Sequence, residues 1–332
     1  MNLYKNFSEC VGKTPLIKLN KVSEETGCNI YGKCEFLNPG GSVKDRAALQ
    51  IINDAIKEKK LTKGGIIVEG TAGNTGIGLT LVCNSLGIKT VIVIPETQSK
   101  EKKDMLKLCG ADLRQVKALP YKDPGNYIRF SETLSKKIKN ENGVFWANQF
   151  DNISNMKAHF LTTGPEIWNQ TEGKVDGFVC SVGTGGTISG VSKFLKEKKK
   201  NVKIALADPH GSALYNFYKN GELKAEGDSI TEGIGQGRIT KNLEYLQLDE
   251  SFRVSDEEAL SEVFYLLKHE GLILGGSSGI NIVGAKKLAR ELGPGKTIVT
   301  ILCDYGTRYK SKIFNKKFLI SKNLEVPEWL QK

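Results

Sequence analysis

The stretch Gly177-Phe-Val-Cys-Ser-Val-Gly-Thr-Gly-Gly-Thr187 decides the fold of this chain. It opens with a short apolar run, which is typical of a buried strand, and it closes on glycines and hydroxyl side chains. In the residues that follow, 188–195, apolar side chains recur at the spacing of an amphipathic helix. A strand, a glycine-rich loop and a helix in direct succession predict an α/β protein.

The same alternation runs through the whole sequence. Short β-branched runs predict strands at residues 14–19, 30–36, 66–69, 89–94, 113–116, 144–147, 177–181, 203–207 and 297–302. Helical spacing predicts helices at residues 43–59, 75–86, 100–108, 128–138, 156–168, 188–195, 256–269 and 280–292. Strands that alternate with helices of this length favour largely parallel sheets, which helices cover on both faces.

The length of the chain favours two domains. It has 332 residues, and one domain holds roughly 150 residues. A polar stretch at residues 150–154 lies between a predicted strand and a predicted helix, so we place the boundary there. Residues 39–150 are expected to form a smaller domain and residues 151–332 a larger one. The first strands, within residues 1–38, are expected to pack on the larger domain.

The composition disfavours several classes of protein. No apolar run approaches the ~18 residues of a membrane helix, and residues 1–10 lack the apolar core of a secretory signal. The seven cysteines form no CxxC pair and there are only three histidines, so neither a metal site nor a disulfide framework is predicted. We therefore expect reduced thiols in a cytoplasmic protein without a membrane segment.

The net charge of +11 comes from 48 Lys and Arg residues against 37 Asp and Glu residues. An excess of this size is compatible with a nucleic acid or an anionic substrate as the partner. The lysines occur in short runs with glutamate nearby, however, which is typical of solvated helix faces. We favour solvated faces and no nucleic-acid partner, and we keep a basic RNA-binding protein as an alternative.

Four loops between a strand and a helix are rich in glycine and hydroxyl residues. They are Asn38-Pro-Gly-Gly-Ser-Val-Lys44-Asp-Arg, Glu69-Gly-Thr-Ala-Gly-Asn-Thr-Gly76, Ser181-Val-Gly-Thr-Gly-Gly-Thr187 and Gly275-Gly-Ser-Ser-Gly279. Glycines let the backbone approach a ligand, and the N–H groups at a helix start bind anions. Because ligands bind beyond the carboxyl ends of the strands in open α/β sheets, we expect the four loops to converge on one cleft.

The third of these loops could belong to a dinucleotide-binding fold or to a site for a single phosphate. Gly183 and Gly185 suit the first, but Ile188 stands where the third glycine of the dinucleotide motif is required. The single-phosphate interpretation is preferred. Beside such a site, Lys44 is either an ordinary surface lysine or an amine that forms a Schiff base with pyridoxal phosphate.

Five motifs resemble the cysteine synthase family. They are Pro39-Gly-Gly-Ser-Val-Lys44-Asp-Arg, Glu69-Gly-Thr-Ala-Gly-Asn-Thr-Gly76, Thr162-Thr-Gly-Pro-Glu-Ile-Trp168, Gly183-Thr-Gly-Gly-Thr187 and Asp304-Tyr-Gly-Thr-Arg-Tyr-Lys-Ser311. The resemblance covers residues 11–313. It implies a pyridoxal 5'-phosphate enzyme with a tryptophan-synthase-like fold, in which two twisted, mostly parallel sheets are flanked by helices and the cofactor lies between them. The smaller domain would carry the substrate loop, and the larger domain would bind the phosphate.

The resemblance also implies roles for individual residues. Lys44 would carry the cofactor and act as the catalytic base, Asn74 would meet the 3′-hydroxyl of the cofactor, and Ser277 its pyridine nitrogen. The cofactor phosphate would bind to Gly183, Thr184, Gly185, Gly186 and Thr187. The substrate would contact Thr71, Ala72, Gly73, Asn74, Thr75, Gln149, Gly233 and Arg238.

The implied activity is the synthesis of L-cysteine from O-acetyl-L-serine and sulfide through an α-aminoacrylate. The alternatives are O-phosphoserine or O-succinylserine as the substrate, another nucleophile as in cystathionine synthesis, and a catalytically idle paralogue that binds a partner. The family further implies a homodimer, with serine acetyltransferase as a candidate partner.

Two departures from the family pattern bear on the substrate. Ala72 stands where the family has serine, so the carboxylate loop lacks one hydroxyl. Gln236 and Arg238 replace apolar residues of the family in the loop 233–238. A guanidinium that faces the leaving group would favour an anionic one. The alternative is that Arg238 points outward, to solvent or to a carboxylate such as Glu232.

Overall fold

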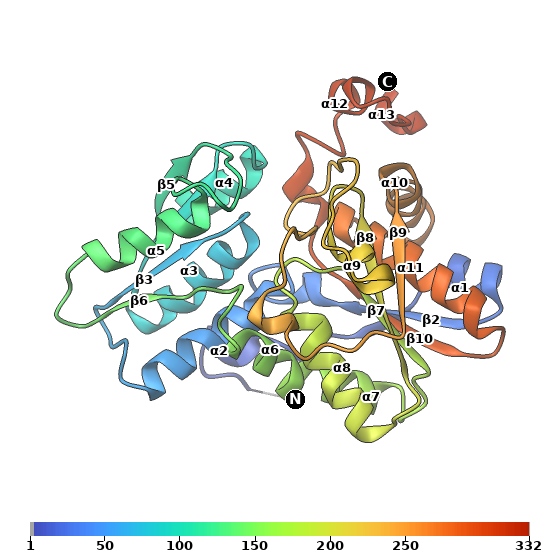
Figure 1. Cartoon of the computed structure of the whole chain (residues 1–332), viewed down its shortest axis with the longest axis horizontal. Coiled ribbons are helices and arrows are strands. Elements are labelled where there is room, and N and C mark those ends of the chain that lie inside the picture. Colours follow the sequence, from blue (N-terminus) through green and yellow to red (C-terminus); the bar gives the residue numbers. More distant parts are fainter. Residues whose placement is uncertain (1–2, 332) are drawn as a thin grey trace.

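The computed structural model describes residues 3–331 and contains two β-sheets with helices on their faces (Figure 1). The larger sheet has six strands in the order β1-β2-β10-β7-β8-β9. These are β1 (Leu16–Lys18), β2 (Asn29–Cys34), β7 (Gly177–Cys180), β8 (Lys203–Pro209), β9 (Glu250–Val254) and β10 (Thr297–Leu302). Strand β1 is antiparallel to β2, and all other neighbouring strands of this sheet are parallel.

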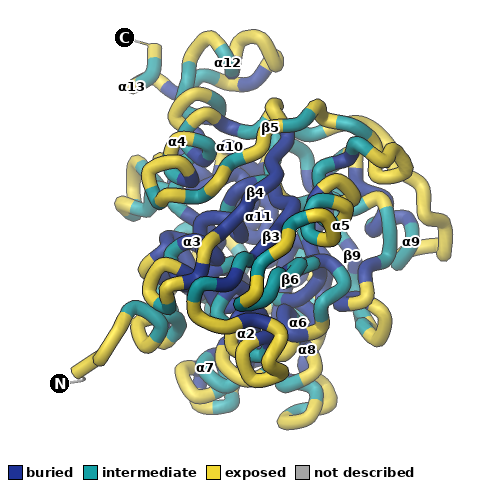
Figure 2. The backbone as a smooth tube through the Cα atoms, turned by 90° about the vertical axis from the view of Figure 1, so that its left-hand side faces the viewer, coloured by how far each residue is buried: buried dark blue, intermediate teal, exposed yellow. Residues whose placement is uncertain are grey.

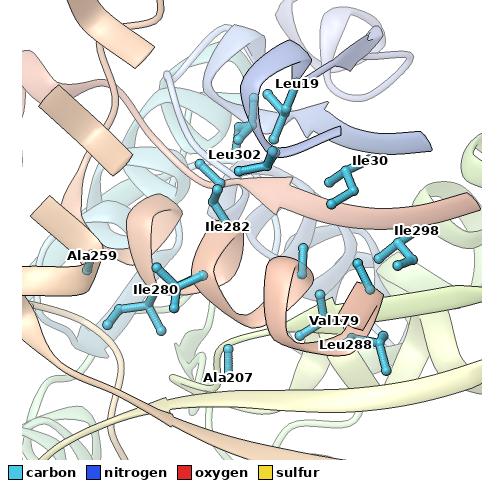
Figure 3. Packing of buried hydrophobic residues seen from close by; sticks show 14 of the residues in the cluster. Leu19, Ile30, Val179, Ala207, Ala259, Ile280, Ile282, Leu288, Ile298 and Leu302 are labelled. Atoms are coloured by element: carbon cyan, nitrogen blue, oxygen red, sulfur yellow. The ribbon is translucent and has the colours of Figure 1, made fainter. Parts of the chain in front are cut away.

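Helices cover both faces of the larger sheet. Successive side chains of its strands point in opposite directions, so apolar side chains on each face need a layer of helices to bury them. The helices are α1 (Asn20–Thr26), α7 (Gly164–Gln170), α8 (Gly186–Lys198), α10 (Asp256–Tyr265) and α11 (Gly276–Leu292). Val179 of β7 packs with α1, α10 and α11, whereas its neighbours Phe178 and Cys180 pack with α7 and α8. Figure 3 shows the first of these clusters, with Leu288 of α11 against the sheet.

The smaller sheet has four parallel strands in the order β5-β4-β3-β6. Its strands are β3 (Ile66–Gly70), β4 (Lys89–Pro95), β5 (Asp112–Val116) and β6 (Val144–Trp146), and its helices are α2 (Lys44–Lys57), α3 (Asn74–Leu86), α4 (Lys100–Leu108) and α5 (Tyr127–Lys137). Burial is concentrated in β3, β4 and α3, whereas α4 and α5 expose their outer faces (Figure 2). Helices α2 and α3 pack on each other in one apolar cluster.

The predicted architecture is confirmed, because every predicted strand is present and the two sheets are mostly parallel. Among the described residues, one strand and four α-helices were not predicted, namely β9, α1, α9 (Leu214–Asn220), α12 (Lys316–Ser321) and α13 (Glu328–Gln331). Strand β9 lies at the edge of the sheet. In its sequence, Glu250-Ser-Phe-Arg-Val254, only two residues are apolar, so the alternation of polar and apolar residues is too short to predict a strand. Helix α1, Asn20-Lys-Val-Ser-Glu-Glu-Thr26, is almost entirely polar, so its short apolar face gave no helical pattern.

The helix predicted at residues 156–168 is three consecutive segments. Helix α6 (Ser154–Ala158) is followed by a π-helical turn, His159–Thr163, and then by α7. Pro165 lies in the first turn of α7, where a residue without an N–H is tolerated, and the wider π turn precedes it. The chain closes with α12 and α13. Among the described residues, no helix combines the length and the apolar character needed to span a membrane.

We propose that the domain boundary lies near residues 150–154, as the sequence indicates. The division is supported by the strands, since β3 to β6 fall within residues 39–150 and β7 to β10 within residues 151–332. Strands β1 and β2 belong to the larger sheet, in keeping with the expectation for residues 1–38. Phe7, by contrast, packs on the cluster between α2 and α3.

A buried cluster of four charged residues fixes the start of α2 to the larger sheet. The guanidinium of Arg46 donates to both carboxylate oxygens of Glu35 and to both of Glu166, at 2.7 and 2.8 Å in each case. Glu35 directly follows β2 and Glu166 lies on α7, where Lys33 Nζ contacts it at 2.6 Å. Two cations and two carboxylates together make this Arg46 cluster neutral, which is the condition for burying such charges.

The Arg46 cluster predicts how stability changes in acid. Burial alone would raise the pKa of Glu166, but the hydrogen bonds and charges of Arg46 and Lys33 outweigh it and hold that pKa at about 2, below the ordinary 4.5. Because the folded pKa is lowered, the stabilisation is complete above pH ~4.5 and is lost as the pH falls towards ~2. Glu166→Gln should therefore flatten the dependence of the unfolding free energy on pH within this window, as measured by urea denaturation.

The matched control for this prediction is Glu172→Gln. Glu172 pairs with Lys174 at the surface, where both side chains are more than 70% exposed, at 76% and 72%. Because solvent screens the interaction between exposed side chains, this change should leave the slope close to that of the wild type. A wild-type slope in Glu166→Gln would contradict the role given to the cluster.

Candidate active site

A cavity of about 260 Å³ lies at the carboxyl ends of the strands, with walls from both sheets. All four glycine-rich loops line it, so the convergence expected from the sequence is present. The sequence predicts a strand before each loop, but the fourth, residues 275–279, follows the π-helical turn Leu266–Glu270 and not a strand of either sheet. The lining includes Lys44, Thr71, Ala72, Gly73, Asn74, Thr75, Gln149, Gly183, Thr184, Gly185, Thr187, Gly233 and Ser277. Two residues of the predicted site, Gly186 and Arg238, do not line the cavity.

The loop between β7 and α8 brings several chain segments into close contact. A Cβ atom at Gly183 would collide with the carbonyl oxygen of Gly233, and one at Gly186 would collide with the side chain of Asn155. Gly185 has a φ of +89°, in the left-handed region that favours glycine. Helix α8 begins at Gly186, and the first N–H groups of a helix, which lack partners within it, attract an anion.

Buried side chains hold the two threonine hydroxyls of this loop. Thr184 Oγ1 accepts a hydrogen bond from Asn155 Nδ2 at 2.8 Å, and Thr187 Oγ1 lies 3.2 Å from His159 Nε2. Burial lowers the pKa of His159 to about 3, so its imidazole is neutral at physiological pH. His159 therefore contributes a hydrogen bond to this loop but no charge.

Lys44 is the first residue of α2, and it lines the cavity. The loop before it is attached to the end of β10, because the N–H of Val43 donates to the carbonyl oxygen of Cys303 at 2.9 Å and Ser42 pairs with Asp304. Arg46, in the same helical turn, carries the buried ion pairs of the Arg46 cluster. The Lys44 side chain thus extends from a backbone that is fixed to the larger sheet.

The second glycine-rich loop leads from β3 into α3. Gly73 has a φ of +128°, and α3 begins at the next residue, Asn74. Thr75 Oγ1 donates to Gln149 Oε1 at 2.5 Å, which joins this loop to the segment after β6. The N–H groups at the start of α3 suit a carboxylate, as those of α8 suit a phosphate.

Ser277 lies in the first turn of α11 and lines the cavity. The N-cap of this helix is Gly275, and no side chain caps it, so the hydroxyl of Ser277 is not used as a cap. The neighbouring Ser278 instead accepts the N–H of Cys303 at 2.9 Å, which ties this helix start to the end of β10.

The structure corrects the expectation that Arg238 faces the substrate. Its guanidinium donates to both carboxylate oxygens of Asp151, at 3.0 and 2.9 Å, and lies 4.6 Å from the ring centre of Tyr121. The charge is thus already paired outside the cavity, and its partner is Asp151 rather than Glu232. We therefore do not retain Arg238 among the substrate contacts.

Lys102 and Glu232 line the cavity although the sequence did not indicate them. Lys102 Nζ contacts Glu232 Oε2 at 2.8 Å, and the two side chains are 1% and 5% exposed. Burial alone would raise the pKa of Glu232, but the charges of Lys102 and Lys312 outweigh it and hold that pKa below its usual range. Lys102 belongs to a run of lysines typical of a solvated face, and its partner is 130 residues away, so no local pattern could indicate the pair.

Two thiols also line the cavity, those of Cys180 and Cys303. Burial raises the pKa of Cys303 to about 11 and that of Cys180 well above its ordinary value. Since the thiolate is the reactive form, neither side chain is suited to act as a nucleophile at neutral pH. Both belong to the apolar cluster under α8.

Comparison with known proteins agrees with the resemblance found in the sequence. Residues 7–304 match the family described as pyridoxal-phosphate dependent enzyme. Cysteine synthase 1 of Neurospora crassa is 51% identical to this chain, over 99% of the chain and 88% of its own length. The cysteine synthase of Dictyostelium discoideum is 47% identical, over 96% of the chain and 86% of its own length. The resemblance to the cysteine synthase family is confirmed.

The fold is shared with a solved structure. The crystal structure of O-acetylserine dependent cystathionine β-synthase from Helicobacter pylori matches with a TM-score of 0.85 and 35% sequence identity. The match covers 94% of this chain and 99% of that one.

The residues around the cavity fit pyridoxal phosphate. This cofactor needs an amine for its aldehyde, hydrogen-bond donors for its phosphate and a partner for its pyridine nitrogen. Around the cavity, Lys44 has an amine, the start of α8 with its crowded glycines has N–H donors, and Ser277 has a hydroxyl. The family match and the chemistry of the cavity lead to the same conclusion, that this chain belongs to the pyridoxal-phosphate dependent enzymes and, within them, to the cysteine synthase family.

Proposed function

We propose that this chain makes L-cysteine from O-acetyl-L-serine and sulfide, by replacing the β-substituent of the activated serine. The observation that carries the proposal is the convergence of Lys44, the loop 183–187, the loop 71–75 and Ser277 on one cavity. The relatives named cysteine synthase cover nearly the whole chain, so the proposal applies to the entire protein and not to one segment of it.

In this proposal the larger sheet provides most of the cofactor site. Lys44 binds the cofactor aldehyde, Gly183 to Thr187 hold its phosphate at the start of α8, Ser277 meets its pyridine nitrogen, and Asn74 meets its 3′-oxygen. When bound, pyridoxal phosphate withdraws electrons from the α-carbon of an amino acid that is attached to it. A serine hydroxyl, unlike an aspartate, leaves the pyridine nitrogen largely unprotonated, which moderates this withdrawal and favours elimination over racemisation.

Substrate recognition is assigned to the start of α3. The N–H groups of Thr71 and Gly73 already donate to Val93 and to Thr71 Oγ1, so the substrate carboxylate is assigned to the remaining N–H groups of the loop 71–75. The side chain of Gln149, bonded to Thr75, lies beside them. Ala72 supplies no hydroxyl, so its backbone alone contributes here. With the cofactor bound, the amine of Lys44 would be the base that takes the proton from the substrate α-carbon and returns it.

A second candidate function uses the same chemistry with another nucleophile. The similar Helicobacter pylori structure is that of an O-acetylserine dependent cystathionine β-synthase, which favours the same activated serine with a thiol amino acid in place of sulfide. An anionic leaving group, as in O-phosphoserine or O-succinylserine, loses its main support, since Arg238 is paired with Asp151. We further propose a cytoplasmic homodimer with serine acetyltransferase as its partner, on the basis of the family alone.

Lys44→Ala is the direct test of the proposed function. Loss of both the cofactor link and the base should reduce the turnover of O-acetylserine and sulfide by several orders of magnitude. The matched control is Lys57→Ala at the exposed end of the same helix. This variant should keep wild-type activity and the yellow colour of the bound cofactor. Near-wild-type cysteine formation by Lys44→Ala, assayed with the purified protein, would refute the proposal.

Arg238→Ala tests whether this arginine contacts the leaving group of the substrate. Because the guanidinium is paired with Asp151, its removal should change kcat/KM for O-acetylserine and for O-phosphoserine by the same factor. Steady-state kinetics on the two substrates measure this ratio. A loss restricted to O-phosphoserine, on the order of 1–3 kcal/mol as expected for a charged hydrogen bond, would show that Arg238 turns towards the substrate.

A further inference from the structure

The motif Asp304-Tyr-Gly-Thr-Arg-Tyr309 begins two residues after the end of β10, and the proposed function leaves it without a role. Asp304 is fully buried, and its Oδ2 accepts hydrogen bonds from Asn74 Nδ2 and from the hydroxyl of Tyr309, both at 2.6 Å. Asn74 stands at the start of α3, next to the smaller sheet. The motif therefore reaches across the cavity from the larger sheet to a residue of the smaller one.

The opposite end of the same amide is also held. Arg308 Nη1 donates to Asn74 Oδ1 at 2.6 Å, and Nη2 donates to the carbonyl oxygen of Gly40 in the loop before Lys44. Asp304 and Arg308 thus bind the nitrogen and the oxygen of one side chain, from two positions four residues apart.

The chemistry of these two partners allows one orientation of the amide. An ionised carboxylate can only accept hydrogen bonds, and a guanidinium can only donate them. If the Asn74 amide were rotated by half a turn, oxygen would face Asp304 and nitrogen would face Arg308, and both hydrogen bonds would become repulsive contacts. In the orientation observed, one N–H and one oxygen lone pair of Asn74 remain for a ligand.

Asp304 also connects the other parts of the site. Its backbone pairs with Ser42, and its carbonyl oxygen accepts the N–H of Gly275 at 3.1 Å. Ser42 lies two residues before Lys44, and Gly275 lies two residues before Ser277. One residue therefore contacts the segments that carry Lys44, Asn74 and Ser277.

We propose that Asp304 and Arg308 are positioning residues, which fix the Asn74 amide so that its remaining N–H serves the 3′-oxygen of the cofactor. The inference rests on the proposed function, in which Asn74 contacts that oxygen. The N–H is the group required, because an ionised oxygen can accept a hydrogen bond but cannot donate one. Without its two charged partners, the amide is free to present its oxygen instead.

The test uses Asp304→Asn and Arg308→Gln, with Arg290→Gln on the exposed end of α11 as the control. An amide at position 304 or 308 can both donate and accept, so it no longer dictates the orientation of Asn74. Each of the two variants should weaken pyridoxal phosphate binding to the apoprotein by roughly 10- to 100-fold, the scale of one charge-assisted hydrogen bond. Each should also shift the visible absorption band of the bound cofactor, which a merely structural role would leave unchanged. The control should bind like the wild type.

A double-mutant cycle with Asn74→Ala separates this inference from the proposed function. If Asp304→Asn or Arg308→Gln acts through Asn74, its effect on cofactor affinity should largely disappear in the Asn74→Ala background. Additive effects, or an unshifted band in the variant that folds, would overturn the positioning role. Arg308→Gln carries the test alone if Asp304→Asn does not fold. Wild-type cofactor affinity in Asn74→Ala would instead contradict the contact proposed for Asn74.

Discussion

Arg46 places a guanidinium in the interior of the protein, and the position of the active site depends on how that charge is neutralised. A buried ion costs several kcal/mol unless it is fully paired, so the arginine holds Glu35 and Glu166 by two hydrogen bonds each. Both carboxylates belong to the larger sheet and its helices, whereas the apolar face of α2 packs with α3. The first turn of α2, which contains Lys44, is therefore fixed to the larger sheet. The rest of the helix packs with the helices and strands of the smaller sheet.

This constraint gives the site its geometry. Strands β7 and β10 are neighbours in the larger sheet, where α8 follows β7 and α11 precedes β10. The first turns of both helices line the cavity that contains Lys44. The start of α3 approaches from the smaller sheet, and the contacts of Asn74 with Asp304 and Arg308 cross between the two. The start of α8, the amine of Lys44 and the start of α3 thus line one cavity, although they come from distant parts of the chain.

The sequence predicted the parts of this arrangement that depend on local patterns. Strands followed by glycine-rich loops indicated the parallel sheets, and the motifs around Lys44 and Gly183 to Thr187 indicated the cofactor site. Side-chain pairs between distant residues left no such pattern. Of the two orientations considered for Arg238, the structure has the outward one, but its partner is Asp151, 87 residues away, and not Glu232. The pair of Lys102 and Glu232 was missed for the same reason. The edge strand β9 was missed because its short polar sequence resembles a loop.

The central claim is that Lys44, and no other lysine of the cavity, holds the cofactor. Borohydride reduction of the yellow holoenzyme makes the link between lysine and cofactor permanent, and mass spectrometry of the digested protein then locates it. The cavity offers a competing amine in Lys102, so the measurement has two distinct outcomes. The prediction is that the label falls on the peptide that contains Lys44, at one equivalent per chain. A label on the Lys102 peptide would contradict it.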